Sequence, residues 1–122
     1  MLRRRARAIL MFVLVATATA TVFAHMKASR MLPAANATVS ASPGQVQVWF
    51  TQAPDPKVSK IEVAGPAGPV ALTAFKVTAE KSIVADIRTP LADGRYTVRW
   101  QAAGDDGHVQ KGEFAFNVKL PR

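Results

Sequence analysis

The 122-residue sequence contains no cysteine, which removes two common ways of stabilising a small protein or binding a metal. Without cysteine there is neither a disulfide framework nor a thiolate metal cage. The length suits one domain, and about 100 folded residues can bury a hydrophobic core without covalent cross-links. The fold must therefore be stabilised by packing, and a bound metal must use nitrogen, oxygen or thioether ligands.

Acidic residues are few, and the excess of positive charge is concentrated at the N-terminus. The formal net charge is +8, of which Arg3, Arg4, Arg5 and Arg7 supply half. Residues 25–122 contain 12 Lys and Arg and 8 Asp and Glu, a formal charge of +4 that is dispersed along the chain. This part has no Lys/Arg-rich run and no RNA-binding motif. We therefore expect a mildly basic, solvated surface and no nucleic-acid partner.

Residues 1–24 have the three regions of a secretory signal peptide. A basic region precedes an uncharged stretch, residues 8–24, which ends in Val22-Phe23-Ala24, with small or modest side chains at the positions that signal peptidase reads. The alternative is a retained transmembrane anchor, but the stretch is marginally short for a span and contains three threonines. We expect cleavage after Ala24; the twin arginines lack the rest of a Tat pattern, so the export route stays open.

Cleavage after Ala24 makes His25 the first residue of the mature protein and gives it a free α-amine. The amine nitrogen and the imidazole Nδ1 of an N-terminal histidine close a six-membered ring around a metal ion. An α-amine ordinarily titrates at about 7.7–8.0 and an imidazole at about 6.5, so proton competition is weak near neutral pH. In the precursor the same nitrogen is an amide and cannot bind a metal in this way.

The remainder of the chain, residues 25–122, is predicted to be an all-β domain. No stretch has a helical apolar period with caps, whereas short β-branched and aromatic runs alternate with Pro and Gly. About seven strands are expected, the number in an immunoglobulin-like sandwich. They cover residues 26–31, 45–51, 58–63, 70–75, 82–87, 94–101 and 112–118.

One local pattern supports the sandwich class more specifically. Asp93-Gly94 predicts a turn, and Tyr96 follows at the start of a strand, which is the arrangement of a tyrosine corner. The alternative is an ordinary turn followed by a strand tyrosine. Five strand aromatics are expected to divide between core and surface with a period of two. They are Trp49, Phe50, Trp100, Phe114 and Phe116.

The second of the two histidines, His108, lies in Gly104-Asp-Asp-Gly-His-Val109. In extended backbone, residues i and i+2 project to the same face, so Asp106 and His108 are expected to point to one spot, with Asp105 facing away. An Asp-x-His triplet is a weak motif by itself, because a lone loop histidine is usually only solvated.

Together with His25, this triplet provides an amine, two imidazoles and a carboxylate, an N₃O ligand set. Tetragonal coordination by nitrogen and oxygen favours Cu(II), which also heads the affinity order of the divalent metals. Zn(II), which accepts the same atoms in a tetrahedral arrangement, is the main competitor. Cu(I) prefers thioethers, and only Met26 and Met31 remain after cleavage.

At this point the sequence resembles the periplasmic copper-resistance protein C (CopC-like) family over essentially all of residues 25–122. The resemblance rests on a histidine directly after a leader, on strand sequences in the first half and above all on the C-terminal part. The matching segments are Ser29-Arg-Met-Leu-Pro-Ala-Ala-Asn36, Ser42-Pro43 before residues 46–50, Val58-Ser-Lys-Ile-Glu-Val63, Asp93-Gly-Arg-Tyr-Thr-Val-Arg-Trp100, Asp106-Gly-His108 and Lys111-Gly-Glu-Phe-Ala-Phe116.

The resemblance implies a seven-stranded, cupredoxin-like Greek-key sandwich that binds Cu(II) in the periplasm through His25, Asp106 and His108. Some family members also hold Cu(I) in a loop rich in methionine and histidine. This chain has Gln52-Ala-Pro-Asp-Pro-Lys57 there, so a Cu(II)-only type is expected. Some relatives have a second histidine shortly after the first, where this chain continues with Met26-Lys27.

Three functions fit these features. The leading hypothesis is a non-enzymatic, monomeric Cu(II) carrier or buffer, with any inner-membrane copper transporter being a separate chain. The second is a copper-dependent oxidative enzyme with a histidine brace, although the mature chain is small and shows no nucleophile constellation. The third is a metal-free adhesive or structural sandwich.

Overall fold

The computed structural model describes residues 25–122; the predicted leader, residues 1–24, lies outside the described residues. The described part contains strands and no helix, which confirms the all-β prediction, and so it offers no helix able to cross a membrane. The strands are β1 (Ala28–Leu32), β2 (Thr38–Val39), β3 (Gln45–Phe50), β4 (Lys60–Gly65), β5 (Gly68–Pro69), β6 (Lys76–Thr78), β7 (Ser82–Asp86), β8 (Gly94–Ala103) and β9 (Val109–Val118).

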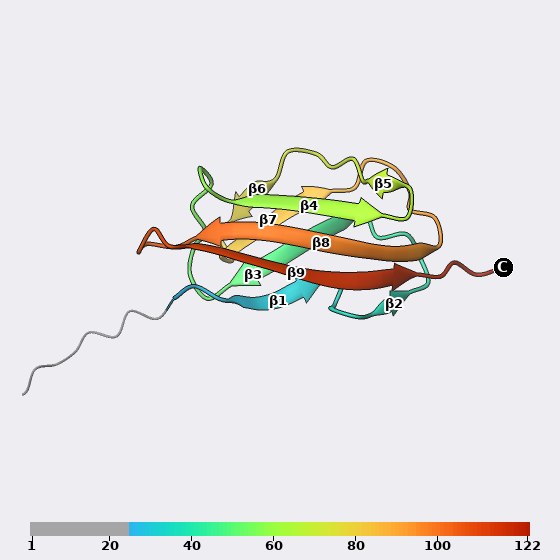
Figure 1. The fold of residues 1–122 in the computed structure, drawn as a ribbon, viewed down its shortest axis with the longest axis horizontal. Coiled ribbons are helices and arrows are strands. Elements are labelled where there is room, and N and C mark those ends of the chain that lie inside the picture. Colours follow the sequence, from blue (N-terminus) through green and yellow to red (C-terminus); the bar gives the residue numbers. More distant parts are fainter. Residues whose placement is uncertain (1–24) are drawn as a thin grey trace, which may run out of the picture.

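The strands form two sheets that pack as a sandwich (Figure 1). One sheet has the order β1-β3-β7-β6 and the other the order β2-β9-β8-β4-β5. Neighbouring strands are antiparallel, except that β2 runs parallel to β9. The longest pairing joins β8 to β9, from Gly94↔Val118 to Ala103↔Val109. The predicted sandwich is therefore confirmed.

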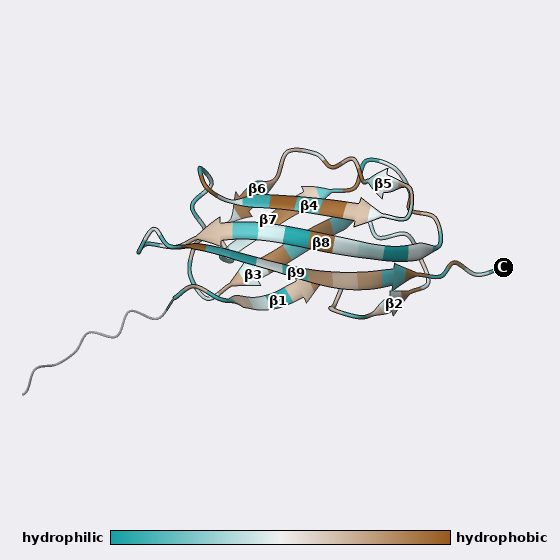
Figure 2. Ribbon diagram, viewed as in Figure 1, coloured by the Kyte–Doolittle hydropathy of each residue, from teal (hydrophilic) through white to brown (hydrophobic). Residues whose placement is uncertain are grey.

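The core lies between the sheets because apolar and polar side chains alternate along the strands. Hydrophilic and hydrophobic residues alternate along β4 (Figure 2), where Ile61 and Val63 are buried and Lys60 and Glu62 are exposed. Burying such an aliphatic side chain contributes about 1.5–3 kcal/mol. The predicted division of the aromatics is also confirmed: Phe50, Phe114 and Phe116 are buried, whereas Trp49 and Trp100 are partly exposed.

The predicted tyrosine corner is present at the start of β8. The Tyr96 hydroxyl donates a hydrogen bond to the carbonyl oxygen of Ala92, with an oxygen–oxygen distance of 2.7 Å. The Tyr96 ring is buried and stacks on Phe116, with ring centroids 5.5 Å apart. The ring also lies against Gly65, where any side chain would collide with it. The corner therefore closes the end of the sandwich at which β8 begins.

The predicted strand over residues 70–75 is wrong. This segment contains only one isolated bridge, between Leu72 and Ile87. Val70 donates its backbone N–H to Val63 in one sheet, and Thr73 donates to Asp86 in the other sheet. The segment therefore crosses between the sheets and cannot extend a ladder in either. The strand that follows, β6, begins at Lys76 and has three residues.

Candidate metal centre

Three parts of the chain meet at one end of the sandwich. Figure 1 shows that the start of the described chain, the β8–β9 loop and the connection from β3 to β4 lie at the same end, whereas the C-terminus lies at the other. The β8–β9 loop comprises residues 104–108, because the two strands pair as far as Ala103 and Val109. This end therefore brings together the two histidine-bearing segments.

The N-terminal arm, which we define as His25 to Lys27, is anchored by its buried middle residue. Met26 is 2% exposed and belongs to the hydrophobic core, whereas His25 and Lys27 are exposed. An irregularity in the pairing of β1 with β3 lies between Ala28 and Arg30. Such a bulge changes the phase of the alternation, so that Met26, Ala28 and then Met31 all pack toward the core. The burial of Met26 thereby leaves the His25 side chain outside.

The β8–β9 loop is a turn that is closed by hydrogen bonds between its own residues. Gly107 has a φ of +72°, a conformation that favours glycine. Its N–H donates to the Gly104 carbonyl, at 3.1 Å. Asp106 Oδ1 accepts the backbone N–H of His108, also at 3.1 Å. Asp106 and His108 do point to one spot, as predicted, but the cause is this turn rather than the alternation of an extended strand.

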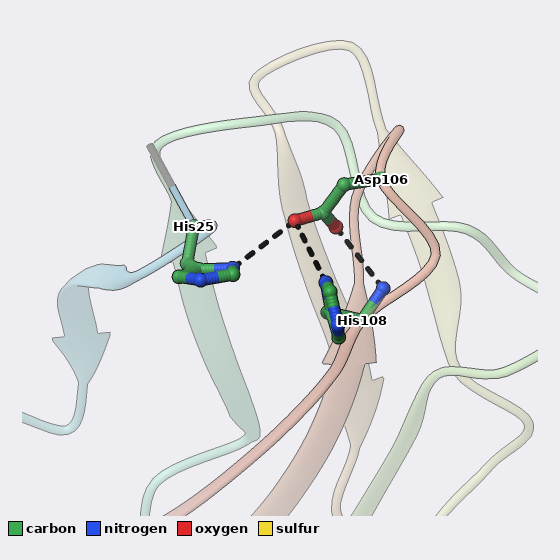
Figure 3. Close-up of side chains that lie close together, drawn as sticks. All are labelled: His25, Asp106 and His108. Carbon is green, nitrogen blue, oxygen red and sulfur yellow. Dashed lines mark hydrogen bonds and ion pairs between the residues drawn. The ribbon is translucent and has the colours of Figure 1, made fainter. Parts of the chain in front are cut away.

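His25, Asp106 and His108 form a compact cluster (Figure 3). Asp106 Oδ2 lies 3.1 Å from His25 Nδ1 and 3.4 Å from His108 Nδ1. The imidazole rings are 5.1 Å apart between centroids and nearly perpendicular, at 84°. One ligand atom from each residue lies within 4.8 Å of the others. Ligands on adjacent positions of a metal with bonds of about 2.0–2.1 Å are separated by roughly 2.8–3.4 Å, which the two Asp106 distances match.

The cluster is open to solvent around a more sheltered carboxylate. The side chains of His25 and His108 are 56% and 70% exposed, whereas that of Asp106 is 18% exposed. The backbone N–H of His108 is the main cause that lowers the pKa of Asp106 below its usual value, and the hydrogen bonds with the two histidine side chains add to it. Asp106 is therefore a carboxylate at neutral pH, which presents negative charge to a cation entering from solvent.

Asp105 does not belong to the cluster. The residues that support the N-terminal arm were not predicted from the sequence. Met26 is one of them, and its signal was an apolar side chain between two polar residues ahead of a strand. Thr51 is the other: it exchanges hydrogen bonds with Lys27. No local pattern distinguishes Thr51 from other threonines.

Comparison with known proteins gives consistent results. The model of the CopC domain matches residues 28–119, a span that contains Asp106 and His108 and begins three residues after His25. The protein YobA of Escherichia coli is 32% identical over 104 residues, covering 83% of this chain and 84% of that protein. Copper resistance protein C of Escherichia coli is 32% identical over 108 residues, covering 81% and 85%.

Two solved structures, one of a CopC protein and one of PcoC, are similar to this chain. CopC from Methylosinus trichosporium matches with a TM-score of 0.72 and 28% identity, covering 80% of this chain and 97% of that one. PcoC from Escherichia coli, described as a methionine-rich copper resistance protein, matches with a TM-score of 0.71 and 32% identity, covering 79% and 100%. The similarity therefore extends over nearly the whole of each relative.

Proposed function

This chain belongs to the CopC family, and from that premise we propose that it is a periplasmic Cu(II)-binding protein that carries or buffers copper. The site we propose consists of His25, Asp106 and His108. The observation that carries the proposal is the convergence of both histidines of the chain on one carboxylate oxygen. Residues 25 and 108 are remote in sequence, and none of the three residues belongs to the hydrophobic core.

The chemistry of the cluster suits a divalent cation. Both Nδ1 atoms face Asp106 Oδ2, where each is placed to share a proton with it. A cation that displaces those protons accepts two nitrogen lone pairs and one carboxylate oxygen. Removal of the predicted leader, residues 1–24, adds the α-amine of His25 and completes an N₃O set. The precursor is left with a weaker site that has two histidines and no amine.

Among the metals, Cu(II) is favoured over Zn(II) and Cu(I). Nitrogen and oxygen ligands in a tetragonal arrangement suit Cu(II), whereas Zn(II) is placed lower in the affinity order for the same atoms. Cu(I) needs soft ligands. In residues 25–122 the methionines are Met26, which is buried, and Met31, which is partly buried against the core, and neither is in the cluster of His25, Asp106 and His108.

The test is a Cu(II) titration of the exported protein after intact mass has shown that it begins at His25. We expect one tight Cu(II) site, with binding weakened at least 100-fold in both His25→Ala and His108→Ala, because each variant loses one imidazole ligand, and the control Asp105→Asn unchanged. Unchanged affinity in both histidine variants would refute the proposed site. A Zn(II) competition in the same protein should leave Cu(II) bound.

We propose no catalytic role, because a carrier or buffer needs only to bind and release copper reversibly. We further propose that the protein is a monomer and that any inner-membrane transporter receiving the copper is a separate chain. Oxidised oligosaccharides formed from a polysaccharide in the presence of the copper-loaded protein and a reductant would show instead that the histidine pair is an oxygenase centre.

A further inference from the structure

The segment Thr51–Asp55, which follows β3, contacts both halves of the cluster. At its first residue, the Thr51 N–H donates to the Lys27 carbonyl at 2.9 Å. The Lys27 N–H in turn donates to Thr51 Oγ1 at 3.0 Å. This reciprocal pair fixes the backbone two residues after His25. Because a chain end frays unless it is tied down, the pair restrains the N-terminal arm.

The other end of the segment holds the β8–β9 loop. The Asp55 N–H donates to the carbonyl of Ala103, the last residue of β8, at 2.9 Å. The Gln52 side chain lies directly against Gly104, where a methyl group would collide with Gln52 Oε1. Gly104 opens the loop that contains Asp106 and His108. Between these contacts Pro54 is buried, which attaches the segment to the body of the sandwich.

We propose that Thr51–Asp55 is a positioning segment that sets the separation between the two halves of the metal site. This inference rests on the proposed Cu(II) site and names the residues that pre-organise it. Metal ligands must be held to within about 0.5 Å of the productive geometry by supporting contacts. Here one short segment supplies supports to both sides, through Thr51 on the N-terminal arm and through Gln52 and Asp55 on the loop.

Thr51→Val tests the arm side, and the chain offers a matched control. Thr73 is also exposed and makes the same reciprocal pair with Asp86, at 2.9 and 3.0 Å, but in the segment that crosses between the sheets. We expect Thr51→Val to weaken Cu(II) binding about 3- to 10-fold, as the loss of one hydrogen bond allows. Thr73→Val should bind as the wild type, and Thr51→Ser should restore binding. Equal affinities in Thr51→Val and Thr73→Val would overturn the inference.

A measurement without metal separates this inference from the proposed function. The imidazole NMR signals of His25 should shift and broaden in metal-free Thr51→Val and remain unchanged in Thr73→Val, because only the first releases the arm. If the wild type binds no Cu(II), the proposed function fails, and these signals still decide whether Thr51 positions His25. Unchanged His25 signals in Thr51→Val would refute the positioning role even if copper binds.

Gly104→Ala tests the loop side. The added methyl group must displace Gln52 or the loop. We expect about 3- to 10-fold weaker Cu(II) binding, and Gln52→Ala, which removes the side chain that lies against Gly104, should also weaken binding. Gly44→Ala is the control, since a methyl group there meets nothing within 4 Å. Wild-type binding by both Gly104→Ala and Gln52→Ala would show that this contact does not position the loop.

Discussion

Replacing Met26 with alanine tests whether packing in the core holds the adjacent His25 in place. The Met26 side chain is 2% exposed, whereas that of His25 is 56% exposed. Truncating a buried methionine to alanine costs about 2–5 kcal/mol. Because the N-terminal arm has a free end after cleavage and can relax toward the vacated space, we expect the low end of this range, about 2 kcal/mol.

This loss weakens the docking of the arm and so reduces the fraction of molecules in which His25 reaches Asp106. The apparent dissociation constant rises as that fraction falls. A loss of about 2 kcal/mol limits the rise to about 30-fold. We therefore expect Met26→Ala to bind Cu(II) about 10- to 30-fold more weakly than the wild type, although all of its proposed ligands are intact.

The assay is a competition titration against a chromophoric Cu(II) chelator, together with thermal unfolding of the metal-free protein. Met26→Leu, which nearly conserves volume, should stay close to the wild type in both. Met31→Ala is the second control, because Met31 packs against the core from within β1 but does not adjoin His25. Met31→Ala should lower the Tm and leave Cu(II) binding unchanged. If Met26→Ala lowers the Tm but binds Cu(II) like the wild type, the proposed link between packing and the site is wrong.

Three further predictions concern the carboxylate, pH and the tyrosine corner. Asp106→Asn should weaken Cu(II) binding by about 10- to 100-fold while Asp105→Asn does not, and equal titration curves would exclude a role for Asp106. Binding should weaken below about pH 5 because the nitrogen ligands become protonated. Since the pKa of Asp106 is lowered, its carboxylate is still ionised near pH 5, and its contribution to folding stability is lost only as the pH falls below the usual pKa of an aspartate. An affinity that is the same below about pH 5 as at pH 7 would contradict ligation by histidine. Tyr96→Phe removes the hydrogen bond to Ala92 and should cost about 1 kcal/mol, lowering the Tm by about 4–8 °C in calorimetry without changing Cu(II) binding at the other end of the sandwich. An unchanged Tm would show that this bond does not stabilise the fold.

Local patterns in the sequence determined most of the fold and named the candidate ligands. Short β-branched and aromatic runs bounded by Pro and Gly predicted β3, β7, β8 and β9 to within a few residues, because strand propensity and turn residues are local properties of the chain. The turn before Tyr96 predicted a tyrosine corner for the same local reason. With two histidines in the chain, one beside an aspartate, the candidate metal ligands were also evident from residue types alone.

Tertiary structure decided which side chains meet and what supports them. Residues 70–75 have the composition of a strand, yet they cross between the sheets because their hydrogen-bond partners belong to different layers. His25 and Asp106 are 81 positions apart, and the distance between them depends on how the N-terminal arm and the β8–β9 loop are held at one end of the sandwich. The irregularity in β1 and the contacts of Thr51 set that distance. Such contacts join distant parts of the chain, so they have no period or spacing that the sequence by itself displays.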